Sequence, residues 1–207
     1  MILIVDFDDV LFDAAELKEK FFSVLEAHGV KNPRDHYTYE RANDRPFSLR
    51  GFLNRVCKEE GVTVPTEELY EEIMSVCHEL RNEELVTLMA DVGKESTYIV
   101  TSGEEEFQRD KIARSGIGEH AKVIIVVPGS KKEAIENICK QFPNETVIFV
   151  DDKVKFFSDL DMAAHPNLKT ILYTNHDVRK VVEEEIQNAL QAEYVKSQQM
   201  MGVPKMR

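Results

Sequence analysis

In the segment ILIVDFDD, residues 2–9, four apolar residues are followed at once by the carboxylates of Asp6, Asp8 and Asp9. A short apolar run without alternation is typical of a parallel strand that is buried on both faces. Side chains alternate along an extended chain, so Asp6 and Asp8 can both project from one strand-to-loop turn. The stretch therefore predicts a buried strand with an acidic carboxyl end.

Further runs of the same kind predict the rest of a parallel sheet. They lie at residues 97–100, 123–127 and 147–150, with a fifth at 170–173. Helix-length segments separate the runs, and strands that alternate with helices are typical of βαβ units. The expected fold class is α/β, a doubly wound parallel sheet, in which ligands bind beyond the carboxyl ends of the strands. Residues 176–199 are expected to form a polar closing helix.

The segment between the first two predicted strands is too long for a simple connection, since a crossover between parallel strands needs only a dozen or more residues. Apolar residues recur in it every three or four positions, which is helical spacing. We therefore expect a small α-helical cap at residues 14–93, inserted into an α/β core made of residues 1–13 and 94–207. Residues 31–46 hold prolines amid charges and are expected to form a loop.

A second pair of carboxylates, Asp151 and Asp152, directly follows the predicted strand at 147–150. Oxygen ligands from two strand ends suit a hard cation such as Mg²⁺. Either acidic pair taken alone is also compatible with a turn that merely solvates the end of a strand. The two pairs together favour a metal site.

Two predicted helix starts directly follow strands and offer groups that can bind an anion. Thr101 follows the run at 97–100, and Ser102 and Ser130 each begin the S/T-x-x-E pattern of a capping box. The Thr101 hydroxyl and the free backbone N–H groups of a helix start can bind phosphate, although a simple N-cap is the alternative. Lys131 lies where the helix dipole disfavours a cation, and an anionic partner would explain its placement.

In their order along the chain, four motifs resemble those of the haloacid dehalogenase (HAD) superfamily, and in particular of its phosphatases. They are ILIVDFDD at 2–9, YIVTS at 98–102, SKKEA at 130–134 and IFVDD at 148–152. The resemblance covers residues 1–13 and 97–175 and implies a Rossmann-like core. A helical insert after the first motif resembles the caps of members that act on small metabolites.

The resemblance also implies a role for each matched residue. Asp6 would be the nucleophile that accepts the phosphoryl group, and Asp8 would be the general acid and base. Because the dehalogenases of the family lack a carboxylate at the position of Asp8, phosphate transfer is favoured over dehalogenation. Thr101, Ser102 and Lys131 would hold the substrate phosphate. The implied ligands of Mg²⁺ are Asp6, Asp8, Asp151 and Asp152.

The sequence departs from the family pattern at three points. Asp9 lies where a glycine is common, so the course of the loop after Asp8 is open. Lys132 competes with Lys131 for the lysine role, although the spacing favours Lys131. A clear additional acid after Asp152 is missing, and Asp159 and Asp161 are the candidates for it.

The expected function is that of a Mg²⁺-dependent phosphatase, which hydrolyses a small phosphorylated metabolite through an aspartyl-phosphate intermediate. A phosphomutase of the same family, a non-catalytic protein that binds a phosphorylated ligand and a receiver-like signalling protein are the alternatives. Arg41, Arg45 and Arg50 of the insert could contact a substrate, but a solvated charged surface is expected for them.

The net charge and the cysteine pattern limit which partners and which cellular compartment are expected. The formal net charge of −12 repels nucleic acid and anionic membranes. The three cysteines follow no C-x-x-C pattern, which fits a reducing cytoplasm, and no apolar stretch is long enough for a signal peptide or a membrane span. We therefore expect a cytoplasmic protein whose partner is a small phosphorylated substrate.

Overall fold

The computed structural model describes residues 1–42 and 45–174 and, beyond them, residues 180, 183, 184, 186–188, 191, 194 and 195. Within these residues a five-stranded, all-parallel sheet has the strand order β3-β2-β1-β4-β5. The strands are β1 (Ile2–Val5), β2 (Thr97–Ser102), β3 (Val123–Val127), β4 (Val147–Asp151) and β5 (Leu168–Leu172). The predicted parallel α/β sheet is confirmed. The predicted closing helix at 176–199 falls largely outside the described residues.

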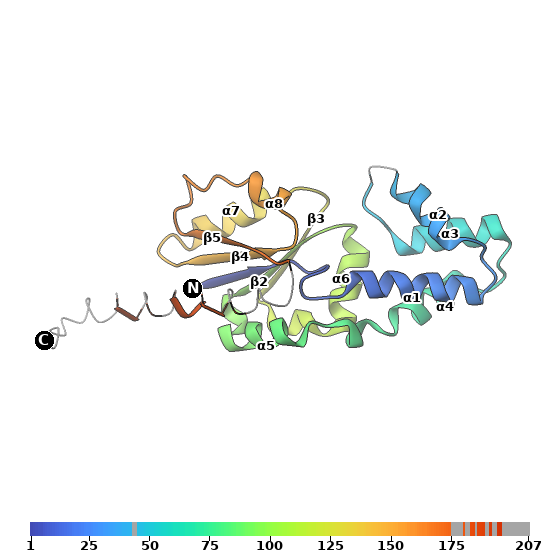
Figure 1. The fold of residues 1–207 in the computed structure, drawn as a ribbon, viewed down its shortest axis with the longest axis horizontal. Coiled ribbons are helices and arrows are strands. Elements are labelled where there is room, and N and C mark those ends of the chain that lie inside the picture. Colours follow the sequence, from blue (N-terminus) through green and yellow to red (C-terminus); the bar gives the residue numbers. More distant parts are fainter. Residues whose placement is uncertain are drawn as a thin grey trace, which may run out of the picture.

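Helices connect the strands, and part of the connection between β1 and β2 forms the insert (Figure 1). Those of the insert are α1 (Ala14–Ala27), α2 (Pro33–Arg41), α3 (Leu49–Glu60) and α4 (Thr66–Met74), with the short 3₁₀ helix η1 (Cys77–Leu80). Those that follow are α5 (Glu83–Val92), η2 (Lys94–Ser96), α6 (Glu105–Ser115), η3 (Ile117–His120), α7 (Lys132–Gln141) and α8 (Lys155–Ser158). No described helix is both long enough and apolar enough to cross a bilayer.

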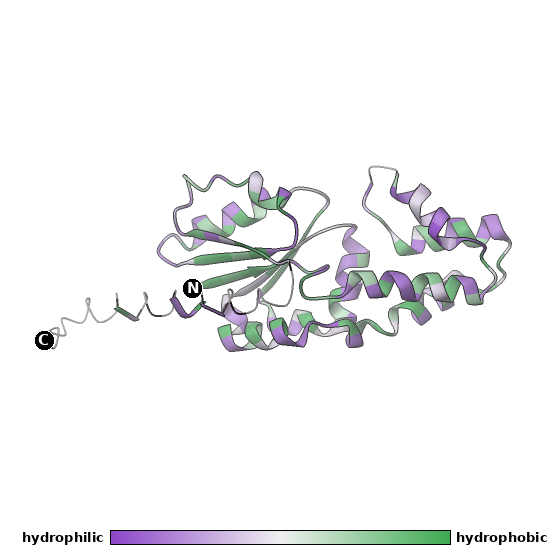
Figure 2. Cartoon of the chain, viewed as in Figure 1, coloured by the Kyte–Doolittle hydropathy of each residue, from purple (hydrophilic) through white to green (hydrophobic). Residues whose placement is uncertain are grey.

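The strands bury both faces, as their apolar runs predict. Ile2 and Ile4 pack in one cluster with residues of α7 and α8, whereas Leu3 and Val5 pack in another with residues of α5 and α6. The second cluster continues into the insert without a break. Figure 2 shows the strands as mostly hydrophobic and the insert helices as a mixture of hydrophobic and hydrophilic residues. The sheet is therefore doubly wound, with helices on both sides.

The chain leaves and re-enters the sheet region at adjacent points. The Asp13 backbone N–H donates to the Leu80 carbonyl at 2.9 Å, and the Asn82 N–H donates to the Leu11 carbonyl at 2.8 Å. These bonds tie the two ends of the insert together beside β1. Figure 1 shows α1–α4 extending away from the sheet, whereas α5 lies below the strands. The boundaries of the predicted cap, residues 14–93, stay a prediction.

The predicted loop at residues 31–46 is wrong in part, because it contains helix α2. Pro33 stands at the first helical position, where its fixed φ suits a helix and its missing N–H costs nothing. This helix buries only Pro33, so it has no apolar stripe of helical period. Its charged, exposed composition therefore resembles that of a loop.

The predicted capping box at Ser102 is also wrong, since Ser102 is the last residue of β2. Helix α6 begins at Glu105, and the Glu104 carboxylate accepts hydrogen bonds from the backbone N–H groups of Glu106 and Phe107 at 3.2 and 2.8 Å. An acidic N-cap is as suitable as a hydroxyl, because it is negative at the positive end of the helix. The strand therefore runs two residues further than predicted.

Candidate active site

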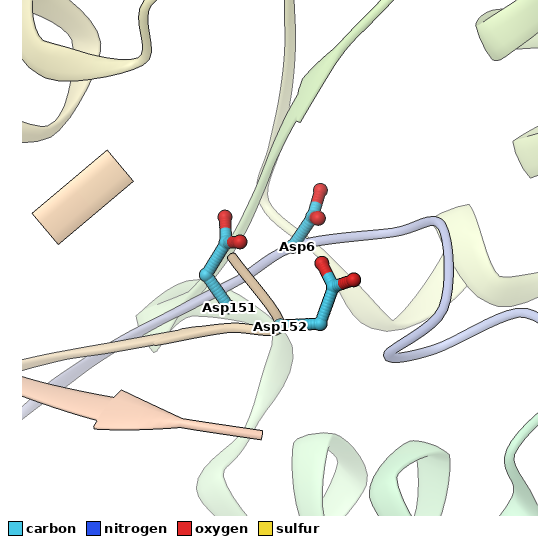
Figure 3. A group of neighbouring side chains, drawn as sticks. All are labelled: Asp6, Asp151 and Asp152. Carbon is cyan, nitrogen blue, oxygen red and sulfur yellow. The ribbon is translucent and has the colours of Figure 1, made fainter. Parts of the chain in front are cut away.

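Three carboxylates converge at the ends of β1 and β4 (Figure 3). Parallel pairing of Val5 with Val150 brings Asp6, the residue after β1, beside Asp151, the last residue of β4. The Asp6 N–H donates to the Val150 carbonyl at 2.9 Å and fixes this alignment. Carboxylate oxygens of Asp6, Asp151 and Asp152 lie within 4.8 Å of one another. The sheet register thus brings Asp6, from the first predicted acidic pair, together with both residues of the second pair.

Lys131 supplies the charge that allows two buried carboxylates to lie together. Its Nζ lies 2.6 Å from Asp6 Oδ1 and 2.6 Å from Asp151 Oδ2, and the residue is only 1% exposed. Lys132 turns away, and its Nζ contacts Glu136 Oε1 at 2.6 Å and a backbone carbonyl. The geometry thus favours Lys131 over Lys132, and its role in binding phosphate stays a prediction.

The charge and chemistry of this group fit a hard divalent cation. Three carboxylates face two ammonium groups, since Lys153 Nζ lies 3.0 Å from Asp152 Oδ1. The net charge of these five groups is negative, so they repel an approaching phosphate until a cation binds. Asp6 Oδ2 and Asp152 Oδ2 accept no hydrogen bond from the described residues and offer the oxygen ligands that Mg²⁺ prefers. The residues present therefore fit the predicted cofactor.

Burial raises the pKa of the Asp6 carboxyl from 3.8 to about 7, although Lys131 lowers it, and the neighbouring Asp151 adds to the rise. The folded state then holds the Asp6 proton more tightly than the unfolded chain does. Ionised Asp6 therefore lowers the stability of the metal-free protein. This cost is complete above about pH 7 and fades as the pH falls toward about 4.

Asp6→Asn should consequently stabilise the metal-free protein at high pH. We expect its melting temperature in a chelating buffer at pH 8 to exceed that of the wild type by roughly 2–6 °C. The gap should narrow at pH 5, where the wild-type carboxyl is protonated. Asp91→Asn, at an exposed carboxylate, is the matched control and should change little. A lower melting temperature for Asp6→Asn at pH 8 would contradict this account.

The Asp8 side chain lies apart from the three carboxylates and is held by helix α6. Lys111 Nζ is ion-paired with Asp8 Oδ1, and Gln108 Nε2 donates to Asp8 Oδ2 at 2.8 Å. Gln108 Nε2 also donates to the Ser102 carbonyl at 3.0 Å. Gly103 makes room for this arrangement, since a Cβ there would lie 2.6 Å from Gln108 Nε2. The predicted role of Asp8 as a metal ligand stays a prediction.

Gln108 and Lys111, which are each 3% exposed, are not among the site residues predicted from the sequence. The available signal was their spacing, because they share one helical face with Ile112 and Ser115, both of which are buried. A lysine and a glutamine on the buried face of a helix require polar partners. Lys153 was missed as well, although it directly follows the second acidic pair.

Thr101 and Ser102 lie at the end of β2, on the edge of the same cavity as Asp6. Thr101 Oγ1 is buried and has no hydrogen-bond partner among the described residues. An unsatisfied buried hydroxyl costs about 1–3 kcal/mol, which a bound ligand oxygen would recover. A phosphate oxygen is a suitable partner for this hydroxyl.

The other acidic residues considered in the sequence lie outside the group of three carboxylates. Asp9 adopts a φ of 63°, a left-handed conformation that explains why glycine also suits this position. Asp161 Oδ1 accepts a hydrogen bond from the Ala164 N–H at 3.0 Å, and Asp159 lines the cavity. Among the described residues, neither Asp159 nor Asp161 joins the group of three carboxylates.

The carboxylates open into a cavity of about 850 Å³ between the sheet and the insert. The insert contributes aromatic and basic side chains to its lining, and Arg41 and Arg45 are among them. Both arginines are exposed, as expected for a solvated surface, and both also border the cavity. Arg50 does not line the cavity and forms ion pairs with Glu67 at 2.9 Å and Glu106 at 2.8 Å.

No protein-family model matches the sequence, and a search of curated proteins finds no match. Solved structures do match. A haloacid dehalogenase-like hydrolase from Burkholderia xenovorans is 18% identical, with a TM-score of 0.67 over 86% of this chain and 84% of that one. A haloacid dehalogenase-like family hydrolase from Xanthomonas campestris is 14% identical, with a TM-score of 0.52 over 93% and 94%.

A third similar structure is that of a Thermotoga maritima protein assigned as a β-phosphoglucomutase. It is 19% identical, with a TM-score of 0.54 over 93% of this chain and 99% of that one. At such identities the likeness shows the fold and leaves the activity open. The sheet order, the insert after β1 and these neighbours together show that the chain has the fold of the haloacid dehalogenase-like hydrolases.

Proposed function

We propose that this protein is a Mg²⁺-dependent phosphatase of the HAD superfamily that hydrolyses a small phosphorylated metabolite. The observation that carries the proposal is the convergence of Asp6, Asp151 and Asp152 around Lys131 at the carboxyl edge of the sheet. The Thr101 hydroxyl, which has no partner among the described residues and borders the same cavity, supports a phosphate ligand. The four ordered motifs and the fold support the same class of enzyme.

Asp6 serves as the nucleophile in this proposal. Its carboxylate attacks phosphorus, the bond to the leaving oxygen breaks, and Asp8 protonates that oxygen. Asp8 then removes a proton from water, which attacks the aspartyl phosphate, releases inorganic phosphate and regenerates Asp6. Both residues line the same cavity. Mg²⁺ held by Asp6, Asp151 and Asp152 would supply the positive charge that offsets repulsion between carboxylate and phosphate.

The proposal is tested by assaying a panel of phosphorylated metabolites for release of inorganic phosphate in the presence of Mg²⁺. Steady release identifies a phosphatase. A phosphomutase is the second candidate, favoured by the fold likeness to the T. maritima protein, and it would give an isomerised product without release. Binding without either reaction would identify a non-catalytic protein that binds a phosphorylated ligand.

The proposal also covers the cellular location of the protein and the molecules that it binds. Cys57, Cys77 and Cys139 are all free and buried, which is consistent with a reducing cytoplasm. We propose a cytoplasmic enzyme that acts on small phosphorylated molecules and does not bind nucleic acid or membranes.

The two adjacent lysines provide a matched pair of variants. We expect Lys131→Ala to lower kcat/KM by roughly 10²- to 10³-fold, because it removes a buried cation from the site of charge development. Lys132→Ala should lower it less than about threefold, since its partner is Glu136, a glutamate of its own helix. Steady-state kinetics measure both, and the opposite ranking would show that the motif is placed one residue early.

A further inference from the structure

Two arginines of the insert differ from the other arginines in the described part of the chain. All the others are ion-paired with carboxylates, namely Arg34, Arg50, Arg55, Arg81, Arg109 and Arg114. Arg41 and Arg45 have no carboxylate partner among the described residues, and both line the cavity that contains Asp6. In a chain with 38 acidic and 26 basic residues, partners for an arginine are abundant. Unpaired guanidinium groups on the cavity are therefore unusual here.

The two sides of the cavity also differ in their charges, because the insert side is purely basic whereas the sheet side mixes acidic residues with lysines. The charged residues that the insert contributes to the lining are Lys18, Arg41 and Arg45, all of them basic. The acidic lining residues all come from the sheet side. Since the whole chain carries a net charge of −12, this local excess of positive charge is a feature of the cavity rather than of the composition.

Tyr37 links the two sides. Burial raises the pKa of its phenol, the Arg41 guanidinium opposes the rise, and the Asp8 and Asp9 carboxylates add to it. Tyr37, Arg41 and the acidic residues after β1 all line the same cavity. The cavity that contains Asp6 therefore extends to Arg41 along a lining that includes Tyr37.

The wall around Tyr37 is aromatic. Its ring centroid lies 5.6 Å from that of Phe21 and 5.3 Å from that of Phe47, and both residues line the cavity. An apolar wall suits the carbon skeleton of a ligand and offers nothing to its charged ends. Binding energy for charged ends must come from the sheet side and from the arginines.

We infer that the substrate carries a second anionic group, a carboxylate or a second phosphate, which Arg41 and Arg45 bind while the scissile phosphate lies against Thr101 and Lys131. Guanidinium groups bind both anions through paired, charge-assisted hydrogen bonds. The inference rests on the proposed function and narrows it to one substrate class. The arginines would hold the leaving group, so they bear on specificity and are not catalytic.

The first test compares linear alkyl phosphates of two to five carbons that end in a methyl, a carboxylate or a second phosphate. For at least one chain length, a doubly anionic compound should exceed its methyl-ended counterpart in kcat/KM by roughly 10- to 100-fold, the size expected for charge-assisted hydrogen bonds. The better of the two anions identifies the chemical source. Equal kcat/KM values at every length would overturn the inference.

The second test measures the same ratio in variants. Arg41→Gln combined with Arg45→Gln should bring the ratio of doubly anionic to methyl-ended substrate close to one. Arg34→Gln, on the same helix as Arg41, is the matched control and should keep the wild-type ratio, because Arg34 pairs with Glu19 at 2.6 Å and does not line the cavity. A wild-type ratio in the double variant would show that other groups bind the second anion.

A binding measurement separates this inference from the proposed function. Isothermal titration calorimetry with Asp6→Asn and Mg²⁺ uses the same compounds without turnover. Tighter binding of the doubly anionic compounds by at least tenfold, with no hydrolysis by the wild type, would support the subsite and sink the phosphatase. Hydrolysis without any preference would sink the subsite alone, and neither preference nor hydrolysis would sink both.

Discussion

Removal of Mg²⁺ should lower the rate of phosphate release by about 10³-fold or more, because a bound cation stabilises the charge of the transition state by several kcal/mol. The three clustered carboxylates otherwise repel the phosphate that Asp6 must attack. Release should return when Mg²⁺ or Mn²⁺ is added back. Ca²⁺ should bind but support little turnover, since its flexible coordination need not align the attack.

Two controls are needed, which check the metal content of the protein and its folded state. Protein stripped by chelation and dialysis is assayed after its metal content is confirmed to be negligible, and circular dichroism checks that it is folded. Asp152→Asn should raise the Mg²⁺ concentration required for half-maximal rate. Asp161→Asn should not, because Asp161 lies outside the carboxylate group and bonds the Ala164 N–H. Full turnover by metal-free enzyme would overturn the mechanism.

The part of the site that the sequence predicted depends on sheet geometry alone. Unbroken apolar runs before Asp6 and Asp151 predict two buried parallel strands, and such strands end at a common edge. The observed register of Val5 with Val150 then places the two carboxylates side by side. No knowledge of loops or of the insert is needed for this step.

The part that was missed depends on how helices pack. Whether Lys111 faces solvent or Asp8 is set by the rotation of α6 against the loop after β1, and composition does not record that rotation. Arg41 presents the same difficulty, because an exposed arginine on a polar helix has the same sequence context whether it faces bulk water or a cavity. Tertiary placement, and not residue type, distinguishes these cases.

The two proposed tasks of Asp8 can be separated with a leaving group that hardly needs protonation, such as nitrophenolate. In Asp8→Asn, Asp6 should still attack nitrophenyl phosphate. Hydrolysis of the aspartyl phosphate needs a base for water, so this step should slow by roughly 10²- to 10⁴-fold. Rapid mixing should then show a burst of nitrophenol near one equivalent of enzyme, a slow steady rate and a trapped phosphoenzyme.

The structure adds a requirement to this experiment, because Asp8→Asn leaves the buried ammonium of Lys111 without its carboxylate. An unpaired buried charge is destabilising, so part of the variant could unfold at the assay temperature. The burst amplitude itself counts the folded sites, and a second variant, Asp8→Asn with Lys111→Met, removes the unpaired charge. Both variants should show the burst if Asp8 acts in the second step.

Asp6→Asn supplies the decisive comparison, since its amide cannot serve as the nucleophile and no burst should appear. The same substitution should raise the melting temperature of the metal-free protein at pH 8, so an absent burst cannot be blamed on unfolding. A burst that persists without Asp6 would assign the nucleophile to another residue. Wild-type turnover of alkyl phosphates by Asp8→Asn would remove Asp8 from both proton transfers, because an alkoxide leaving group needs an acid that nitrophenolate does not.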